Sequence, residues 1–300
     1  MAESDAFWRL DDATEMDSQD SFYEHLKRSD HLKFTIFTPD MLTRSDPNFP
    51  QKIEGKTFEK VSFSKTKVIG LIFTNCVFRE CQFIGATLEG CEFHRCQFVK
   101  TNTYKISIVA TYLDPLSFSS CLHWRKHQNI GVHLYQALMN NSRDEEQIEF
   151  ERDAQFLFFR WKRYQDGYTF RKSWSAATKR HDYIHAAKSG SKVLRRLGWE
   201  KLFGCGIRIS YFLRTLIVTL VLATIYNYTY RIELGLKSGE NIISTWSEAL
   251  YFTTVSLTTL GYGDITPTTA FGQISASCQR IVGFALFALV ASMLLRRVTP

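Results

Sequence analysis

The chain has 300 residues, 45% of them hydrophobic, and a formal net charge of +7. This length exceeds one average domain, so we expect two or more parts. The mean hydropathy of −0.17 excludes a chain that lies mostly within a membrane. The N-terminus lacks the basic segment and apolar run of a secretory signal. Seven cysteines, an odd number without the spacing of a disulfide framework, indicate that the bulk of the chain is cytosolic and reduced.

The charge is distributed unevenly along the chain. Residues 1–24 carry eight acidic side chains against one base, Arg9, whereas residues 192–214 carry six bases against one acid, Glu200. This asymmetry predicts an acidic tail and a basic patch that faces an anionic surface. Nucleic acid is one such surface and a phospholipid leaflet is another.

A five-residue repeat runs from Phe58 to Phe118. Twelve of the thirteen residues at every fifth position are apolar, and small side chains recur two positions before them. Neither a helix, with a period of 3.6, nor a strand, with a period of 2, produces this pattern. It predicts a solenoid with four faces of five residues each, in which residues twenty apart stack at the strand spacing of ~4.8 Å.

Residues 55–120 resemble the pentapeptide-repeat family, which implies a right-handed quadrilateral β-helix with phenylalanines along its axis. Residues 1–54 would form the acidic tail and a cap. On this fold Cys76 and Cys96 stack on one face, whereas Cys81 and Cys91 fall on two others. We therefore expect these thiols to pack inward rather than to bind a metal.

Residues 121–208 are expected to form a cytoplasmic helical linker. Ser142 and Glu145 have the spacing of a capping box. An apolar stripe then follows at helical spacing until Asp166-Gly167: Phe150, Ala154, Leu157, Trp161 and Tyr164. Such a stripe packs on a neighbouring helix or on another subunit. His181 and His185 are expected on a solvated helix face rather than as ligands.

Two apolar stretches, 209–230 and 274–295, are each long enough to span a membrane, which takes ~20 residues. Buried helices of a soluble protein are the alternative. Basic residues cluster on only one side of each stretch, which predicts cytoplasmic termini and an external loop that begins with residues 231–244. The linker ends in an apolar and basic segment that we expect to lie on the membrane and to bind anionic lipid. Its basic residues are Lys192, Arg195, Arg196, Lys201 and Arg208.

Between the spans, residues 245–258 predict a short helix that begins at a capping box formed by Thr245 and Glu248. At ~1.5 Å per residue it is ~20 Å long, too short to cross the membrane. It leads into TTLGYGD, residues 258–264. Non-helical backbone at membrane depth is tolerated where it lines a polar cavity or is buried in protein. The glycines permit angles that turn successive carbonyls the same way, and the negative end of the helix favours a cation.

Residues 245–267 resemble the pore helix and selectivity filter of the two-transmembrane potassium channel family, and the resemblance extends over about 209–297. It implies a filter at 259–264 in which the Thr259 hydroxyl and main-chain carbonyls coordinate potassium. Those carbonyls belong to Thr259, Leu260, Gly261 and Tyr262, with Gly263 at the outer mouth. One chain supplies a quarter of the ring, so four identical chains are implied.

The resemblance also implies residues that support the filter: Thr258, Asp264, Tyr251 and Glu248. Val255 stands where some family members have a glutamate that pairs with the acid at Asp264, so we expect the Tyr251 hydroxyl to take that place. Leu260 stands where many members have valine. Gly283 matches the gating hinge of the inner helix. Arg280 departs from the pattern, and we expect it to pack near Glu248 or another polar group.

These observations predict a mixed α and β membrane protein, a homotetrameric potassium-selective channel of the plasma (inner) membrane. Its cytoplasmic repeat domain would regulate gating or assembly. Its partners would be three identical subunits, lipid and permeant potassium, without cofactor, catalytic residues or nucleic acid. One alternative is a non-selective cation channel. Another is a membrane-anchored scaffold whose repeat mimics DNA, which the net positive charge of residues 54–105 disfavours.

Overall fold

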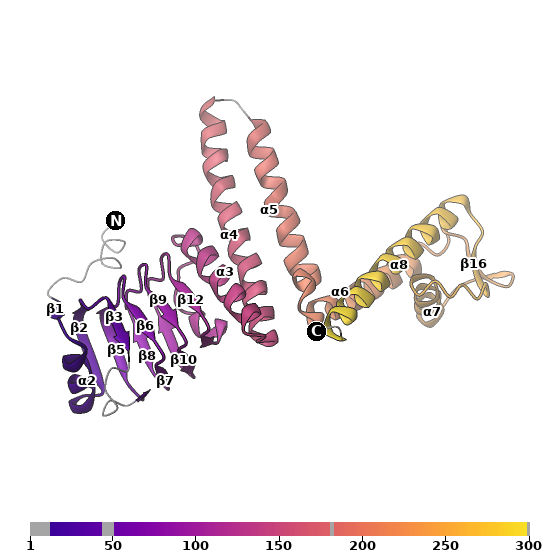
Figure 1. The fold of residues 1–300 in the computed structure, drawn as a ribbon. Helices are drawn as coiled ribbons and strands as arrows, with labels where there is room; N and C mark the ends of the chain where they lie inside the picture. Colours follow the sequence, from indigo (N-terminus) through magenta and orange to yellow (C-terminus); the bar gives the residue numbers. More distant parts are fainter. Residues whose placement is uncertain (1–12, 44–50, 181–182, 299–300) are drawn as a thin grey trace. The chain divides into compact units, whose positions relative to one another are not determined.

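The computed structural model describes residues 13–43, 51–180 and 183–298. The chain divides into two compact units, Met1–Arg196 and Leu197–Pro300. The first unit is a β-solenoid followed by long helices, and the second contains two apolar helices with a short helix between them (Figure 1). The predicted class, a mixed α and β protein with a solenoid, a helical linker and two apolar helices, is confirmed.

Three parallel sheets form three faces of the solenoid, with strand orders β1-β2-β5-β8-β11, β13-β10-β7-β4 and β12-β9-β6-β3. Among the residues that the structure describes, the fourth face has the bridges Ser62–Gln82 and Gln82–Asn102 and no sheet of its own. The strands are β1 (Thr14–Met16), β2 (His31–Phe37), β3 (Met41–Thr43), β4 (Lys52–Glu54), β5 (Thr57–Ser62), β6 (Lys67–Ile69), β7 (Ile72–Thr74), β8 (Val77–Arg79), β9 (Thr87–Glu89), β10 (Glu92–His94), β11 (Gln97–Val99), β12 (Ser107–Val109) and β13 (Tyr112–Leu113).

Residues twenty apart stack in the solenoid, as the five-residue repeat predicts. Phe58 pairs with Phe78 across β5 and β8, and Phe78 pairs with Phe98 across β8 and β11. Both pairs of rings stack with centroids 4.8 Å apart. The core of the solenoid is therefore a column of parallel aromatic rings that join one coil to the next.

The corners of the coils have a regular backbone conformation. Every fifth residue from Gly55 to Ala110 lies in the left-handed region, with φ between +47° and +68°. Four of these twelve corner residues are glycines, which adopt this conformation without strain. The other eight are residues with a side chain, for which the left-handed region is unfavourable. The sequence analysis did not identify this corner position, although the glycines at 55, 70, 85 and 90 mark it.

The inward cysteines donate hydrogen bonds between coils. Cys76 Sγ donates to the Ile53 carbonyl (3.5 Å), and Cys81 Sγ donates to the Phe58 carbonyl (3.3 Å), each 23 residues earlier. Thr101 repeats this geometry through its hydroxyl, which donates to the Phe78 carbonyl at 3.0 Å. Burial raises the pKa of the Cys81 thiol to about 12. The predicted inward packing of these side chains is confirmed.

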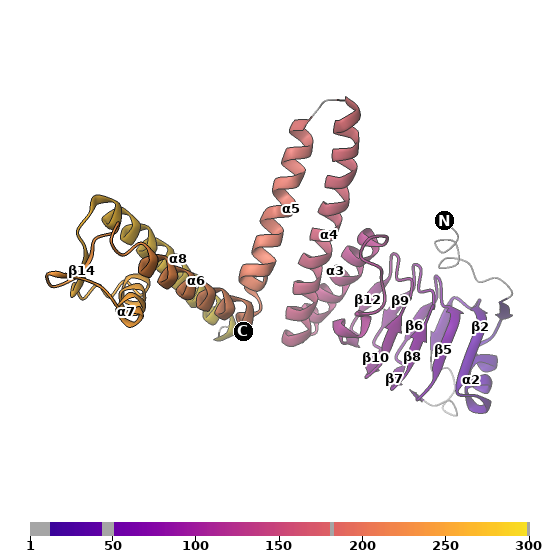
Figure 2. The same cartoon turned by 180° about the vertical axis from the view of Figure 1, so that it is seen from behind.

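The solenoid begins earlier than residue 55. Strands β1 to β3 continue its sheets, and helix α2 (Gln19–Arg28) covers its N-terminal end (Figure 2). Phe22 and Tyr23 of α2 are fully buried in the same core as Phe58. Residues 13–43 are thus part of the solenoid and its cap, whereas residues 1–12 of the acidic tail lie outside the described residues.

Two helices close the other end of the solenoid, after the short 3-10 helix η1 (Pro115–Phe118): α3 (Gln128–Asp144) and α4 (Ile148–Arg180). The Asn141 side chain pairs with the backbone of Thr111, accepting from its N–H (3.0 Å) and donating to its carbonyl (2.7 Å). The Asn141 amide thus makes the hydrogen bonds to the last coil that the backbone of a further strand would have made. Trp161 of α4 packs directly on Gly131 of α3, where an added Cβ would lie 2.2 Å from the ring.

Two predictions for the linker are wrong and one is confirmed. The Ser142–Glu145 capping box does not exist, because α3 already begins at Gln128 and Ser142 lies buried in its last turns. Helix α4 does not stop at Asp166-Gly167, since tertiary packing outweighs the cost of one helical glycine. The stripe packs as predicted, with Ala154 and Trp161 buried within the chain.

Helix α5 (Tyr183–Phe203) follows α4, and the two lie side by side (Figures 1 and 2). Arg196 of α5 pairs with Asp166 of α4. His181 and the side chain of His185 lie outside the described residues.

The second unit contains two helices that are long and apolar enough to cross a membrane, over Ile209–Thr229 and Ala270–Leu295. Its elements are the 3-10 helix η2 (Gly204–Gly206), α6 (Ile209–Thr229), β14 (Leu236–Ser238), β15 (Asn241–Ile242), α7 (Trp246–Leu257), β16 (Ile265–Pro267) and α8 (Ala270–Val298). A three-stranded sheet, β15-β14-β16, lies at one end of this unit. Helix α7 and the TTLGYGD segment lie between the two apolar helices in the sequence, and α7 contacts both of them.

Candidate functional site

The predicted capping box fixes the start of α7. The Glu248 N–H donates to Thr245 Oγ1 (3.3 Å), and the Glu248 carboxylate accepts from the Thr245 N–H (2.9 Å). The same carboxylate accepts from the Ser244 N–H at 2.9 Å. Glu248 is thus used to cap α7, and no ion pair joins it to Arg280 in the part of the chain that the structure describes. Arg280 is exposed on α8, so the expectation that it packs near Glu248 is wrong within one chain.

Helix α7 ends at Leu257, and its last carbonyls are used by the segment that follows. Thr258 is the C-cap residue, and its hydroxyl donates to the Thr254 carbonyl at 2.7 Å. The Leu260 N–H donates to the Val255 carbonyl at 3.1 Å. These bonds anchor the beginning of the TTLGYGD segment to the end of the helix.

The backbone of this segment alternates in handedness. Thr259, Gly261 and Gly263 have φ of +60°, +61° and +84°, whereas Leu260 and Tyr262 do not have positive φ. A left-handed residue at every second position cannot form a helix or a regular strand. An added Cβ at Gly261 or Gly263 would meet no atom within 4 Å, so the glycines serve backbone conformation rather than space.

The hydroxyl of Tyr251 donates to the Asp264 carboxylate at 2.6 Å. This is the contact that we expected, because Val255 stands where some channels have a glutamate that pairs with this acid. Val255 itself is buried. Asp264 Oδ1 also accepts from the Ile265 N–H at 3.2 Å. The end of the TTLGYGD segment is therefore bonded back to the middle of α7.

Gly283 of α8 lies against the end of α7. An added Cβ would lie 1.9 Å from the Leu257 carbonyl oxygen, so this glycine permits a close approach of two backbones. Helix α8 is continuous through this position, from Ala270 to Val298. Close packing is thus a second reason for a glycine here, beside the hinge that the resemblance implies.

The sequence analysis missed a buried polar contact among the three helices. Asn227 of α6 is hydrogen-bonded both to Thr253 of α7 and to Gln279 of α8. The sequence does contain a signal for this contact, because each apolar span includes an amide side chain, Asn227 in the first and Gln279 in the second.

The predicted basic patch is only partly free. Lys192, Arg195 and Lys201 are exposed, and Arg208 is half-buried. The fifth residue, Arg196, pairs with Asp166, which removes it from the set available to lipid.

The end of α5 is attached to the start of α6. The Arg214 side chain donates to the Lys201 carbonyl, and the Thr215 hydroxyl donates to the Leu202 carbonyl at 2.5 Å. Two carbonyls that the end of a helix leaves without partners are satisfied in this way. Arg214, the one charged residue of α6, is thus turned toward this backbone.

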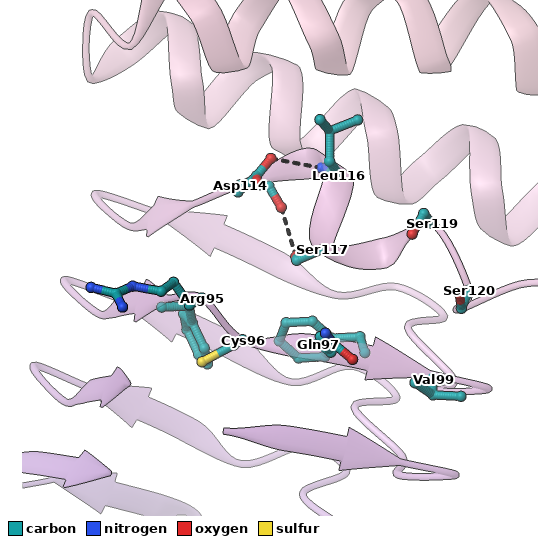
Figure 3. A pocket seen from close by; sticks show the side chains of 11 residues that line it. Arg95, Cys96, Gln97, Val99, Asp114, Leu116, Ser117, Ser119 and Ser120 are labelled. Carbon is teal, nitrogen blue, oxygen red and sulfur yellow. Dashed lines mark hydrogen bonds between the residues drawn. The ribbon is translucent and has the colours of Figure 1, made fainter. Parts of the chain in front are cut away.

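The solenoid contains a cavity of about 330 Å³ beside η1 (Figure 3). It forms because η1 replaces the strand that would have followed β11 in its sheet. The Asp114 carboxylate accepts from the Leu116 N–H at 2.8 Å, and the Ser117 hydroxyl donates to the Asp114 carbonyl at 2.6 Å. The Asp114 carboxylate is therefore occupied in shaping the turn, and the cavity is a consequence of ending the sheet.

Residues 214–299, which include α7 and the TTLGYGD segment, match the family model described as "Ion channel". Residues 57–102 match the model for pentapeptide repeats, in eight copies. The chain joins pentapeptide repeats to an ion channel domain. The ion channel domain begins within α6 and includes all of α8, so the two apolar helices are membrane helices and the chain is a membrane protein.

Several potassium channels are similar to part of this chain. The hyperpolarization-activated voltage-gated potassium channel of Methanocaldococcus jannaschii is 54% identical over 39 residues, which is 13% of this chain and 19% of that protein. The potassium voltage-gated channel subfamily KQT member 4 of Homo sapiens is 35% identical over 66 residues, or 22% of this chain and 10% of that protein. Member 1 of the same subfamily from Xenopus laevis is 40% identical over 58 residues, or 19% and 9%. The chain thus spans about a tenth to a fifth of the length of these relatives.

Proposed function

We propose that four copies of this chain form a potassium-selective channel, with the TTLGYGD segment as its filter. The alternation of left-handed residues at Thr259, Gly261 and Gly263 carries this proposal. In an ordinary strand successive carbonyls point to opposite sides, whereas this alternation turns them to the same side. A column of carbonyl oxygens, completed by the Thr259 hydroxyl, can replace the hydration shell of potassium.

The proposed filter needs more than one chain. Leu260 and Tyr262 are 59% and 70% exposed in the single chain, although both are large and largely apolar. Neighbouring subunits around a fourfold axis would cover them, while the carbonyls from residues 259–262 of each chain form rings around the axis. The similarity to proteins named as potassium channels favours potassium as the permeant ion.

The proposed orientation places both termini in the cytoplasm. Basic residues cluster before α6 and at the end of the second apolar stretch, at Arg296 and Arg297, whereas the segment between the two helices has few. The solenoid and α3 to α5 would then be cytoplasmic parts of a channel in the plasma (inner) membrane. Their proposed role is to regulate gating or assembly.

Anionic lipid is the proposed partner of Lys192, Arg195 and Lys201 on α5. Their exposure leaves them available, and the hydrogen bonds from Arg214 and Thr215 to the end of α5 connect that helix to the first membrane span. A basic segment at the membrane surface gains affinity from each cationic side chain near anionic headgroups.

Ion flux from liposomes tests the proposed function. Purified chain should release K⁺ and not Na⁺, and native mass spectrometry should detect a tetramer. Gly261→Ala should abolish the flux, because alanine is strained at φ +61° while the space for its methyl is open. Equal K⁺ and Na⁺ flux would support the non-selective alternative, and the absence of flux from a folded tetramer would support the scaffold alternative.

A further inference from the structure

A set of hydrogen bonds centred on one amide side chain joins all three helices of the ion channel domain. Its members are Asn227 of α6, Thr253 of α7 and Gln279 of α8. Asn227 and Thr253 are both 0% exposed, and Gln279 is half-buried. Polar side chains at membrane depth are costly unless they are fully hydrogen-bonded, so such a set is a specific feature of the fold.

Each polar atom of the set has a defined role. Asn227 Nδ2 donates to Thr253 Oγ1 (2.8 Å) and to Gln279 Oε1 (3.0 Å), and Gln279 Nε2 donates back to Asn227 Oδ1 (2.8 Å). The Thr253 hydroxyl donates to the Ala249 carbonyl at 2.7 Å, so toward Asn227 it only accepts. Rotating either amide by half a turn would bring like groups together, so the set specifies a single arrangement.

The set lies on the opposite side of α7 from the contact that holds the filter segment. Thr253 and Tyr251 are two residues apart, which places them about 200° apart around a helix. Tyr251 holds Asp264 at the end of the segment, whereas Thr253 accepts from Asn227 of α6, which in turn is bonded to Gln279 of α8. Helix α7 is thus bonded to the filter segment on one side and, on the other, to α6 directly and to α8 through Asn227.

The contact with α8 includes Gly283 as well as Gln279. The two residues are one turn apart on α8: Gln279 is bonded to Asn227 of α6, and Gly283 approaches the Leu257 carbonyl of α7 directly. A movement of α8 away from α6 and α7 would therefore have to break the hydrogen bonds between Gln279 and Asn227.

We propose that the Asn227–Thr253–Gln279 set positions α7, and that it thereby ties the conducting conformation of the filter to the position of α8. This inference rests on the proposed potassium channel function. The three side chains are positioning residues, since within the described residues none of their hydrogen bonds goes to the filter segment itself.

Thr253→Val tests the proposal in the full chain, because it keeps the shape of the side chain and removes the acceptor for Asn227. We expect a roughly threefold to tenfold lower steady K⁺ current at low external K⁺, as for the loss of a membrane-buried hydrogen bond. High external K⁺ should restore the current, because ions that occupy a filter support its carbonyls. Thr253→Ser should behave like the native chain.

Ser275→Ala is the matched control. Ser275 Oγ contacts the Tyr226 hydroxyl at 3.3 Å, so this variant removes a polar contact between the same two spans without touching α7. It should leave the current and its K⁺ dependence unchanged. Gln279→Met provides a second uncharged variant, which should reproduce the K⁺-dependent loss seen with Thr253→Val.

Three outcomes would overturn the proposal. In the first, Thr253→Val and Gln279→Met match the native current at both K⁺ concentrations. In the second, they lose current equally at both. In the third, neither variant assembles while Ser275→Ala does, which would make the set a requirement for folding rather than for filter position. If the native chain shows no K⁺ flux, the proposed function and this inference both fail. If the native chain is K⁺-selective but Thr253→Val and Gln279→Met match its current at both K⁺ concentrations, this inference alone fails.

Discussion

The Tyr251 hydroxyl donates a hydrogen bond of 2.6 Å to the carboxylate of Asp264, thirteen residues later in the chain. This bond closes a loop that contains the end of α7 and the entire alternating segment, residues 259–263. It connects a residue in the middle of a helix to the point where the chain leaves the segment. The geometry of the proposed filter is thus held at both ends, by the cap at Thr258 and by Asp264.

Tyr251→Phe should weaken this closure without changing the packing of the ring. The variant removes a hydrogen bond to a charged group, so we expect a K⁺ current that declines faster during sustained opening. Electrophysiology of reconstituted chain in symmetric K⁺ would measure the decline. Asp264→Asn, which keeps an acceptor, should have a smaller effect, and an unchanged time course in Tyr251→Phe would argue against any role for this bond in the filter.

Gly283→Ala distinguishes close packing from a hinge. The methyl would overlap the Leu257 carbonyl, so α7 must shift, and we expect lost ion selectivity together with a lower melting temperature of the tetramer. A hinge role alone predicts a lower open probability with normal selectivity. Gly167→Ala on α4 is the control, because nothing lies within 4 Å of its added Cβ. It should be neutral or stabilise the helix by up to about 1 kcal/mol.

Lipid dependence can be tested by neutralising the exposed bases of α5. The triple variant Lys192→Gln, Arg195→Gln and Lys201→Gln should bind anionic vesicles more weakly, since each base near such a surface contributes about 1 kcal/mol. Its K⁺ flux should also depend less on the anionic lipid fraction. Arg196→Gln should instead loosen α4 from α5, because it removes the ion pair with Asp166. Equal vesicle binding by the triple variant and the native chain would refute lipid contact at this patch.

The left-handed corners predict opposite effects for two substitutions in the solenoid. Gly90→Ala should destabilise it by about 1 kcal/mol, because φ is +61° there while no atom lies within 4 Å of the new methyl. Ala110→Gly should stabilise it or be neutral, since Ala110 already has φ +47°. Hydrogen–deuterium exchange of solenoid peptides in the full chain would report both. Equal exchange in the two variants would contradict strain at the corners.

Lys56 should fasten α2 to the solenoid. Its ammonium donates to the Leu26 carbonyl (2.7 Å) and to Asp30 (2.6 Å), and it lowers the pKa of the Asp30 carboxyl, chiefly through that hydrogen bond. A lowered folded-state pKa adds stability above the unfolded value, and that stability is lost as pH falls through the folded value. Lys56→Gln should therefore speed exchange in residues 19–28 at neutral pH, and acid should speed it in the native chain but less in the variant. Asp30→Asn is the second variant, because it removes the carboxylate charge and keeps the hydrogen bond from Lys56 to the Leu26 carbonyl.

The sequence predicted those features that repeat or that are local. The period of five residues was sufficient to predict the stacking of Phe58 on Phe78, because a strict period leaves one register. The capping box at Thr245 and Glu248 was predicted because its partners lie three residues apart. Such contacts depend on spacing alone.

Contacts between distant segments were predicted less well. Ser142 and Glu145 match a capping box, yet packing of α3 on the last coil placed them at the end of a helix instead. The Arg196–Asp166 pair depends on α4 continuing past Gly167, which no local rule indicates. The bonds among Asn227, Thr253 and Gln279 join residues 26 and 52 positions apart, so no local pattern shows them.

The left-handed corner at every fifth residue also limits how the solenoid can change in length. A single inserted residue would move each later phenylalanine from the axis to the surface, whereas a block of twenty would add one whole coil and leave every other contact in place. The length of the solenoid can consequently be changed, by evolution or by design, only in whole coils of twenty residues.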